Sequence, residues 1–472
     1  MSSPREVDHP EPAERAGKGR DARAAVPLES HKGWDPPTGR RSPVEILQEQ
    51  AKTRVPDLIP IRHARMTASP FAFYRGAAAV MAADLATTPN SGLQAQICGD
   101  AHLANFGGFA APDRTIVFDV NDFDETHPGP WEWDVKRLAA SFEIAARSRE
   151  FDDKLRKKIV RRVVRSYRNA MHEFAATRNL DLWYTRLDEN DVFDRFRDQL
   201  SSAELKRFQK NLAKARGKDS LKAFAKLSAR VDGEIRIVSD PPLIVRVEEL
   251  MPEVAAQALR DVVRGGFRKY RHSLQPDRRH LVEAFEMVDI ARKVVGVGSV
   301  GTRCWVALML GRDENDPLFL QIKEAEASVL EPYTGASRYA NHGQRVVEGQ
   351  RFMQSASDIF LGWNRFENLA DGTERDFYIR QMWDGKFSPQ IDIMEPEVLG
   401  VYSDMCGSTL ARAHARSGDR IAIASYLGSS DTFDRAVGSF AAAYADQNQH
   451  DFEEVIAAVE SGVLEAHEDQ PV

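Results

Sequence analysis

Residues 286–325 constrain the fold of this chain more than any other stretch. In ARKVVGVGSVGTRCWVALML (291–310) two apolar, β-rich runs flank a cluster of glycines, and a turn-like GRDENDP leads to a third apolar run, LFLQIKEA. Short apolar runs bounded by glycine and turn residues are typical of strands. A dinucleotide-binding loop needs a helix directly after its glycines, and here another strand candidate follows. The sequence therefore predicts a sheet whose first two strands are joined by a glycine loop.

The glycine loop and the third strand carry residues suited to nucleotide phosphates. Gly296, Gly298 and Gly301 match the pattern G-x-G-x-x-G, in which the missing Cβ lets the backbone approach phosphate groups. A strand, a glycine loop, a second strand and a Lys on the third strand form the arrangement of protein kinases. Lys323 occupies that position. We therefore expect the glycines and Lys323 to bind the phosphates of a nucleotide.

The kinase arrangement requires two further features. It needs a Glu on the next helix to orient the lysine, and we expect Glu348 in RVVEGQRFM to do so, with Glu331 as the reserve. It also needs a connection between two lobes beside the nucleotide. The segment YIRQMWDGK (378–386) fits that hinge, so Gln381 and Met382 are expected to line the nucleotide site.

The stretch ICGDAHLANFG (97–107) places Asp100 and Asn105 at an interval of five. Phosphoryl transfer needs a carboxylate near the attacking hydroxyl and ligands for a metal ion that neutralises the phosphate charge. The following strand candidate offers three further carboxylates, Asp119, Asp122 and Asp124. We select Asp100 as the catalytic residue, Asn105 and Asp122 as metal ligands, and keep Asp119 as an alternative ligand.

These motifs resemble those of a known family. GDAHLAN looks like the HGDxHxxN loop of aminoglycoside phosphotransferases, with Cys98 where that family usually has His. In that family the metal-binding Asp is followed twelve residues later by another Asp that starts a helix, and Asp122 and Asp134 reproduce the interval. The resemblance implies the same roles for Asp100, Asn105 and Asp122.

A wider resemblance concerns a bacterial family of unknown function, domain of unknown function 2252. The stretches SPFAFYRGAA, CGDAHLANFG, FDVNDFDET and GPWEWDVKRLAAS carry it. It extends from about residue 43 to the C-terminus, and it implies no substrate.

The order of the motifs is unusual. Kinases carry the glycine loop and the lysine before the catalytic loop, whereas here they come far after it. The motifs together predict an α+β, bilobal, protein-kinase-like fold of the aminoglycoside phosphotransferase type, circularly permuted and with a helical insertion. Permutation is feasible where the termini of a fold lie close together at its surface.

We expect five segments along the chain. They are a disordered tail (1–42), the catalytic-loop and metal-binding part of the C-lobe (43–150), a mostly helical part of the C-lobe or insertion (151–285), the β-rich nucleotide-binding N-lobe (286–395) and C-terminal helices that return to the C-lobe (396–472). The tail is rich in Pro, Gly and charged residues and lacks apolar periodicity. The helical segment is the expected source of acceptor specificity.

Composition narrows the class of protein. A net charge of −7 argues against a general nucleic-acid binder. The 3 cysteines are widely spaced, which favours neither a disulfide framework nor a zinc site and fits a reducing cytoplasm. No apolar run reaches the length of about 18 residues that a membrane span requires. We expect a cytoplasmic protein without a membrane span.

The sequence as a whole predicts a phosphotransferase that uses ATP or GTP with Mg²⁺ and acts on an unidentified small-molecule or protein hydroxyl acceptor. Transfer of a nucleotidyl group is compatible with the same motifs. One alternative is a pseudokinase-like module that binds nucleotide without catalysis. The second is a metallophosphoesterase, because Asp100 and His102 match the D-x-H start of those enzymes and ANHG (340–343) resembles their later Asn-His element.

Overall fold

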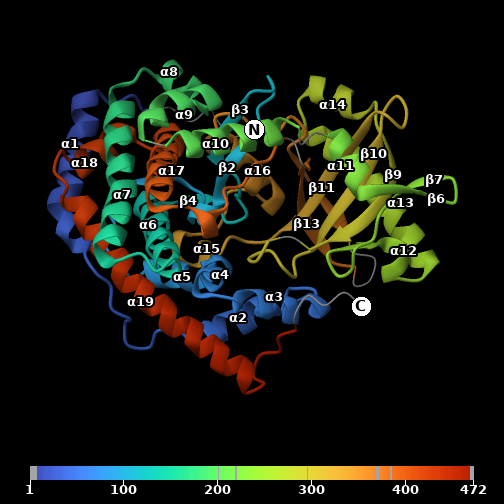
Figure 1. Ribbon diagram of the computed structural model, residues 1–472, viewed down its shortest axis with the longest axis horizontal. Helices are drawn as coiled ribbons and strands as arrows, with labels where there is room; N and C mark the ends of the chain where they lie inside the picture. Colours follow the sequence, from blue (N-terminus) through green and yellow to red (C-terminus); the bar gives the residue numbers. More distant parts are fainter. Residues whose placement is uncertain are drawn as a thin grey trace.

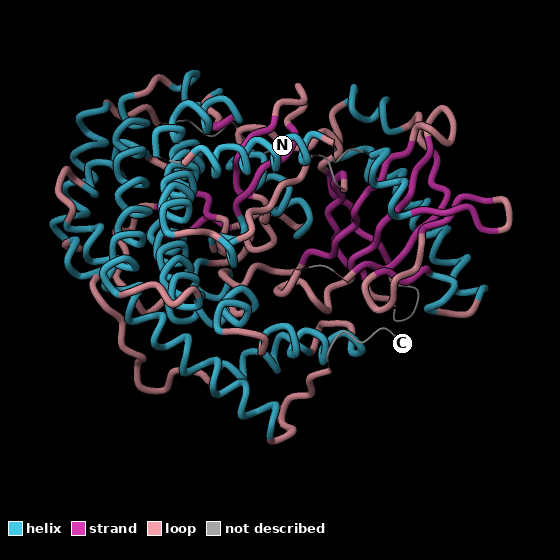
Figure 2. Tube along the Cα trace, viewed as in Figure 1, coloured by secondary structure: helices cyan, strands magenta, loops and turns pink. Residues whose placement is uncertain are grey.

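The computed structural model describes residues 8–199, 201–217, 220–294, 296–367, 372–382 and 385–467. It is an α+β protein in which a helical part lies beside a sheet part (Figure 1). Figure 2 shows most of the strands gathered in the sheet part, with two small groups of strands set among the helices.

The sheet part is built on a six-stranded antiparallel sheet of order β12-β13-β11-β10-β9-β8. Its strands are β8 (Ile244–Arg246), β9 (Glu286–Lys293), β10 (Cys304–Leu310), β11 (Pro317–Ala325), β12 (Gly362–Glu367) and β13 (Glu374–Gln381). The smaller strands are β1 (Gln94–Ile97), β2 (Phe106–Ala110), β3 (Ile116–Val120), β4 (His127–Pro130), β5 (Leu187–Asp188), β6 (Ser228–Val231) and β7 (Glu234–Ile237).

Helices form the rest of the described fold. In the first half of the chain they are α1 (Pro12–Ala25), α2 (Pro43–Ala51), α3 (Ile59–Met66), α4 (Pro70–Gly76), α5 (Ala78–Leu85), α6 (Trp131–Ser148), α7 (Asp153–Ala176), α8 (Asn179–Tyr184), α9 (Glu189–Phe196), α10 (Ser202–Arg216) and α11 (Ser220–Leu227). The later ones are α12 (Val247–Leu250), α13 (Glu253–Tyr270), α14 (Pro276–Val282), α15 (Glu331–Thr334), α16 (His342–Met353), α17 (Pro396–Ser417), α18 (Arg420–Leu427) and α19 (Thr432–Glu460).

The largest core lies in the helical part, where α6, α7, α17 and α19 pack around the small strands. The sheet part has its own apolar layers: α13 covers one face of the six-stranded sheet and α11 the other. Strand β11 shows how the sheet sorts its side chains, because successive residues point to opposite faces. Leu320 and Ile322 join the α13 layer, whereas Phe319 joins the α11 layer. Lys323 therefore emerges on the face opposite the α13 layer.

Most sequence-based element predictions are confirmed. The strands on both sides of the glycine loop are β9 and β10, and the strand that carries Lys323 is β11. The stretch 71–86 has apolar residues at helical spacing and forms two helices, α4 and α5, because the backbone leaves helical geometry at Ala77 (φ −106°, ψ 34°). Among the described residues no helix combines the length and the apolar character needed to cross a membrane.

The expectation of a disordered tail over 1–42 is wrong for the described residues of that segment. Helix α1 packs against α18, with Gly19 so close that a Cβ there would lie 2.1 Å from the carbonyl oxygen of Ala422. Arg15 pairs with Asp419 at 2.8 Å. Periodicity could not identify this helix because it has almost no apolar face. Tertiary contacts hold it in place instead.

Candidate active site

Two polar pockets lie on either side of the glycine loop. The first, here called the helix-side pocket, is lined by Arg54, Arg62, Asp100, Asp124, Glu125 and Gly298, among others. The second, the sheet-side pocket, is lined by Lys293, Lys323, Arg380, Gln381, Met382 and Lys386, among others. Five residues line both pockets: Arg75, Asn105, Asp122, Gly296 and Ser299. The structure thus brings the catalytic-loop motif and the glycine loop to one place, although they lie far apart in the sequence.

A buried aspartate fixes the backbone in front of Asp100. The Asp134 carboxylate, at the start of α6, accepts hydrogen bonds from the backbone amides of Cys98 and Gly99 at 2.8 and 3.0 Å. Gly99 has φ +76°, and a Cβ there would lie 2.6 Å from the carbonyl oxygen of Glu125. Only glycine suits this turn. Asp134, the second residue of the Asp122–Asp134 interval noted in the sequence, therefore has a structural role.

The candidate catalytic residue, Asp100, is held by an arginine that the motif search missed. Arg137 Nε donates to Asp100 Oδ1 at 2.6 Å, and Nη2 lies 2.5 Å from the same oxygen. The guanidinium lies 4.5 Å from the centre of the Tyr74 ring. His102 Nε2 lies 3.7 Å from Asp100 Oδ2. Burial lowers the pKa of His102 to about 3, so its imidazole is neutral at pH 7. Arg137 stands three residues after Asp134 on α6, a spacing that places both on one helix face.

Asn105 and Asp122 offer oxygen ligands at the boundary of the two pockets. Asn105 Nδ2 donates to the carbonyl oxygen of Asp100 at 2.8 Å, which leaves Oδ1 as the acceptor atom of that side chain. Asp122 Oδ1 accepts a 3.2 Å hydrogen bond from the backbone amide of Asp124. Carboxylate and amide oxygens are the ligands that Mg²⁺ prefers, usually completed by water and substrate phosphates. These two residues therefore fit the metal site that the sequence predicts.

Asp119, the alternative metal ligand, has a different task. Its side chain is fully buried and lies in the wall of neither pocket. It forms an ion pair with Arg412 and accepts hydrogen bonds from the backbone amide and hydroxyl of Ser355 at 2.9 and 3.1 Å. The structure removes Asp119 from the candidate ligands and keeps Asp122.

Lys323 pairs with a carboxylate that the sequence analysis noted but did not select. Its Nζ bonds to Asp124 Oδ2, and Asp124 also accepts hydrogen bonds from Tyr378 Oη at 2.8 Å and Ser299 Oγ at 3.2 Å. Burial alone would lower the pKa of Lys323, but Asp122 and Asp124 outweigh it and hold the pKa well above its usual value. The buried ammonium is therefore charged.

The prediction that Glu348 orients Lys323 is wrong. Glu348 forms an ion pair with Arg351 on its own helix at 3.1 Å. Gln350, two positions further along α16, lines the sheet-side pocket with Lys323. Because two helical residues differ by about 200° around the axis, Glu348 faces away. The reserve candidate, Glu331, accepts hydrogen bonds from backbone amides of its own loop instead.

The three glycines of the loop differ in position. Gly296 has φ +60° and lines both pockets, and Gly298 lines the helix-side pocket. Gly301 lies at the base of the loop, where a Cβ would come within 3.0 Å of the Arg54 side chain. The first two glycines are thus placed to contact a ligand, whereas Gly301 provides a close packing position.

Gln381 and Met382, the predicted hinge residues, line the sheet-side pocket. The backbone amide of Met382 donates to the carbonyl oxygen of Phe319 at 2.9 Å, and that of Gln381 donates to the carboxylate of Asp358. Both backbone amides are thus engaged within the protein. Contacts with a ligand would have to use their carbonyl or side-chain atoms.

The metallophosphoesterase hypothesis finds little support in this geometry. In the described part of the chain no group of three or more His, Cys, Asp or Glu side chains is arranged to hold a metal ion. Asn341 caps helix α16, and His342 lies 3.9 Å from Glu331. Neither residue lines the pockets around Asp100.

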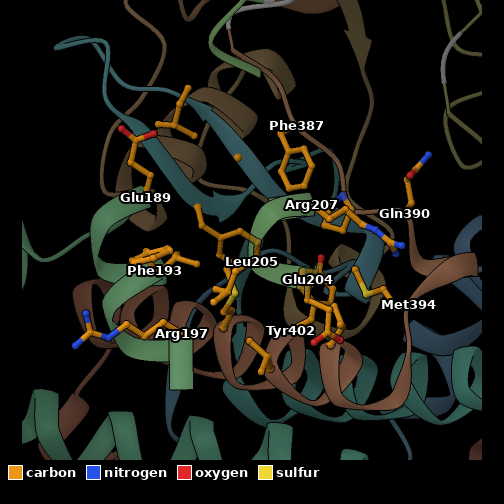
Figure 3. Close-up of a pocket in the computed structure, with 18 of the residues that line it drawn as sticks. Glu189, Phe193, Arg197, Glu204, Leu205, Arg207, Phe387, Gln390, Met394 and Tyr402 are labelled. Atoms are coloured by element: carbon orange, nitrogen blue, oxygen red, sulfur yellow. The ribbon is translucent and has the colours of Figure 1, made fainter. Parts of the chain in front are cut away.

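A third pocket is apolar and is drawn in Figure 3. Phe387, Pro389 and Gln390 line it, whereas Lys386 and Ser388 of the same segment line the sheet-side pocket. Gly108 and Phe387 exchange backbone hydrogen bonds of 2.8 and 2.7 Å and form part of the wall of the apolar pocket. Phe193, Leu205 and Met394 point into it in Figure 3. The described residues of segment 151–285 line this apolar pocket and neither polar pocket. The expected role of segment 151–285 in acceptor specificity therefore has no counterpart among the residues that line the two polar pockets.

Comparison with known protein families matches residues 54–458 to a family described as an uncharacterized protein conserved in bacteria, DUF2252. The chain belongs to the DUF2252 family. Neither the curated proteins nor the solved structures compared with it give a match. All residues discussed above as parts of the two polar pockets lie within the DUF2252 match, whereas α1 lies outside it.

Proposed function

We propose that this DUF2252 protein is an ATP- or GTP-dependent phosphotransferase with a circularly permuted, kinase-like fold. The observation that carries the proposal is that Gly296 and Ser299 of the glycine loop share pocket walls with Asn105 and Asp122. The parts of the sheet support it as well. A hairpin of β9 and β10 carries the glycine loop, the next strand carries Lys323, and α16 follows before β12, which is the order of parts in the nucleotide-binding lobe of kinases.

The sheet-side pocket is the proposed nucleotide site. Its lining includes the cations Lys293, Lys323, Arg380 and Lys386, which suit a polyphosphate. Lys323 would neutralise phosphate oxygens while Asp124 holds its ammonium in place. The same pocket extends to Gln381 and Met382 at the end of β13, so a base can occupy the end far from the transferred phosphoryl group.

The helix-side pocket is the proposed acceptor site, because it contains Asp100. The acceptor hydroxyl oxygen forms a bond to the γ-phosphorus, and the bond from that phosphorus to the bridging oxygen breaks, so ADP or GDP leaves. Asp100, fixed by Arg137, orients the hydroxyl and accepts its proton. Asn105 and Asp122 would hold Mg²⁺, which supplies charge neutralisation at the phosphates when bound. Arg75, in the wall of both pockets, adds a cation at the same boundary.

The test is a calorimetric titration of ATP, GTP and ADP, with and without Mg²⁺, into wild type, Lys323→Met and Asp122→Asn. We expect binding by wild type, a loss of roughly 10-fold or more in Lys323→Met, and loss of the Mg²⁺-dependent part in Asp122→Asn. Lys157→Met is the matched control, because Lys157 pairs with Asp153 on the exposed face of α7. Absence of nucleotide binding by correctly folded wild type would refute the proposal.

Turnover separates the remaining alternatives. Incubation with ATP and candidate acceptors should release ADP from wild type and not from Asp100→Ala. Release of pyrophosphate instead would show nucleotidyl transfer. Nucleotide binding without turnover above background in both wild type and Asp100→Ala would assign the protein to non-catalytic, pseudokinase-like modules.

A further inference from the structure

Arg62 is a buried cation that the proposed nucleotide site does not use. It lies on α3 in the wall of the helix-side pocket and is 1% exposed. Its Nη2 donates to Gln50 Oε1 at 2.9 Å and to the carbonyl oxygen of Gly76 at 3.1 Å. Its Nε and Nη1 are buried without a hydrogen-bond partner. Within the described residues, Arg62 forms no ion pair.

An uncompensated guanidinium in a cavity wall is expensive, because a buried charge needs a partner to offset its lost hydration. Neutral groups such as Gln50 and Gly76 provide two hydrogen bonds but no opposite charge. A phosphate or carboxylate would supply both, since the planar guanidinium binds such groups through two parallel hydrogen bonds. The unpartnered donors of Arg62 are Nε and Nη1. They lie on different edges of the guanidinium, so an oxyanion bound through two parallel hydrogen bonds would use one of them together with Nη2, which also donates to Gln50 and Gly76.

Two other arginines stand in the same wall with unpartnered atoms. Arg54 Nη1 bonds to the carbonyl oxygen of Val300, while its buried Nε has no partner. Arg75 Nε is also buried without a partner. Burial, and after it the charge of Arg54, holds the pKa of Arg62 well below its usual value. Carboxylates of the protein attract Arg54 and Arg75, whereas the charge that acts on Arg62 is that of Arg54. An anion beside Arg62 would offset this repulsion.

The carboxylates of the helix-side pocket are mostly occupied by other cations. Asp100 pairs with Arg137, Asp124 with Lys323, and Glu324 with Arg303 at 3.2 Å. Burial raises the pKa of Glu125 to about 7, with Arg345 opposing the shift. Burial lowers the pKa of Arg54, and Glu326 is the carboxylate that opposes this shift most. Asp122 is the proposed metal ligand. Arg62 is therefore not required to neutralise the acids around it.

We propose that the helix-side pocket binds the phosphate or carboxylate group of an anionic acceptor, held by Arg62 and Arg54, with Arg75 between this group and the transferred phosphoryl group. That the bound anion belongs to an acceptor rests on the proposed phosphotransferase function. The anion site itself is inferred from the arginines alone. The acceptor would then be a small hydroxylated metabolite that carries an oxyanion, and the helices α2 to α4 would set its specificity.

The experiment is a calorimetric titration of inorganic phosphate and, separately, of malonate into the full chain, free and saturated with Mg²⁺ and ADP. Wild type should bind at least one of the two probes, and the preferred probe distinguishes a phosphate-bearing from a carboxylate-bearing acceptor. Arg62→Gln should weaken that binding roughly 10-fold or more. Saturation with ADP should leave it in place, because the nucleotide occupies the sheet-side pocket.

Three results would overturn the inference: no binding of either probe to wild type, equal binding to Arg62→Gln, or displacement of the probe by ADP. Arg75→Gln, at a partly exposed position, should also weaken binding and serves if Arg62→Gln fails to fold. Arg178→Gln is the surface control, since Arg178 pairs only with its neighbour Asp181. If no nucleotide binds but phosphate binding depends on Arg62, the proposed function fails and the anion site remains.

Discussion

The two polar pockets differ in how their cations are balanced. In the sheet-side pocket Lys323 is paired with Asp124, which Tyr378 also holds. In the helix-side pocket Arg62 has neutral partners only. A phosphate that approaches Lys323 must share it with an internal carboxylate, whereas an anion that approaches Arg62 meets a guanidinium held by Gln50 and the carbonyl oxygen of Gly76. This difference matches the two proposals, a ligand that brings its own Mg²⁺ in the sheet-side pocket and a simple anion in the helix-side pocket.

The largest expected effect concerns Asp122, which belongs to both pockets. Asp122→Asn should lower Mg²⁺-dependent release of ADP from ATP by roughly 1000-fold, about 4 kcal/mol in activation free energy, because the metal loses a charged ligand. Coupled-enzyme assay of ADP at several Mg²⁺ concentrations measures it. Asp153→Asn, on the exposed surface of α7, is the control. Retention of a tenth of the activity or more would contradict the role of Asp122.

Asp119→Asn tests whether Asp119 belongs to the walls of the pockets or to the buried core. We expect the free energy of unfolding to fall by about 3–5 kcal/mol, because buried Arg412 would lose its charged partner. Urea unfolding measures the loss. The folded fraction should keep wild-type nucleotide affinity. A stable variant that has lost Mg²⁺-dependent binding would show that Asp119 is the ligand after all.

Glu125, which lines the helix-side pocket, makes the free energy of unfolding depend on pH. Burial raises its pKa from 4.5 to about 7, so between these values the folded state holds a proton that the unfolded state has released. The free energy of unfolding therefore falls as pH rises from about 4.5 to 7, by at most about 3 kcal/mol, since some exposure remains. Glu125→Gln should remove this fall. Urea unfolding at pH 5 and pH 7.5 in chelator-containing buffer tests it, and equal slopes for both proteins would contradict it.

The smallest expected effect concerns Tyr378, whose hydroxyl donates to Asp124. Tyr378→Phe should lower the free energy of unfolding by about 1.5–3 kcal/mol, the typical value of one hydrogen bond to a charged group. Phosphate binding in the helix-side pocket should stay within about 2-fold of wild type. Urea unfolding and phosphate calorimetry measure the two quantities. A large loss of phosphate binding would show that the two pockets are not independent.

Local spacing in the sequence determined much of the fold and part of the site. The two-residue period of LFLQIKEA identified β11 and hence the strand that carries Lys323, and the glycine cluster between apolar runs identified the β9–β10 hairpin. The interval of five from Asp100 to Asn105 identified a loop whose residues do line the pockets. Such features are readable because strand period, turn residues and short intervals fix geometry over a few residues.

Only the tertiary structure decided which charged groups meet. It paired Lys323 with Asp124 rather than Glu348, because the turn of α16 directs Glu348 toward Arg351. It buried Asp119 against Arg412 and left Arg62 without a carboxylate. It also placed helix α1, whose sequence shows almost no apolar face. The physical reason is common to all of these: an ion pair or a buried charge depends on which distant segments pack together, and no local spacing encodes that choice.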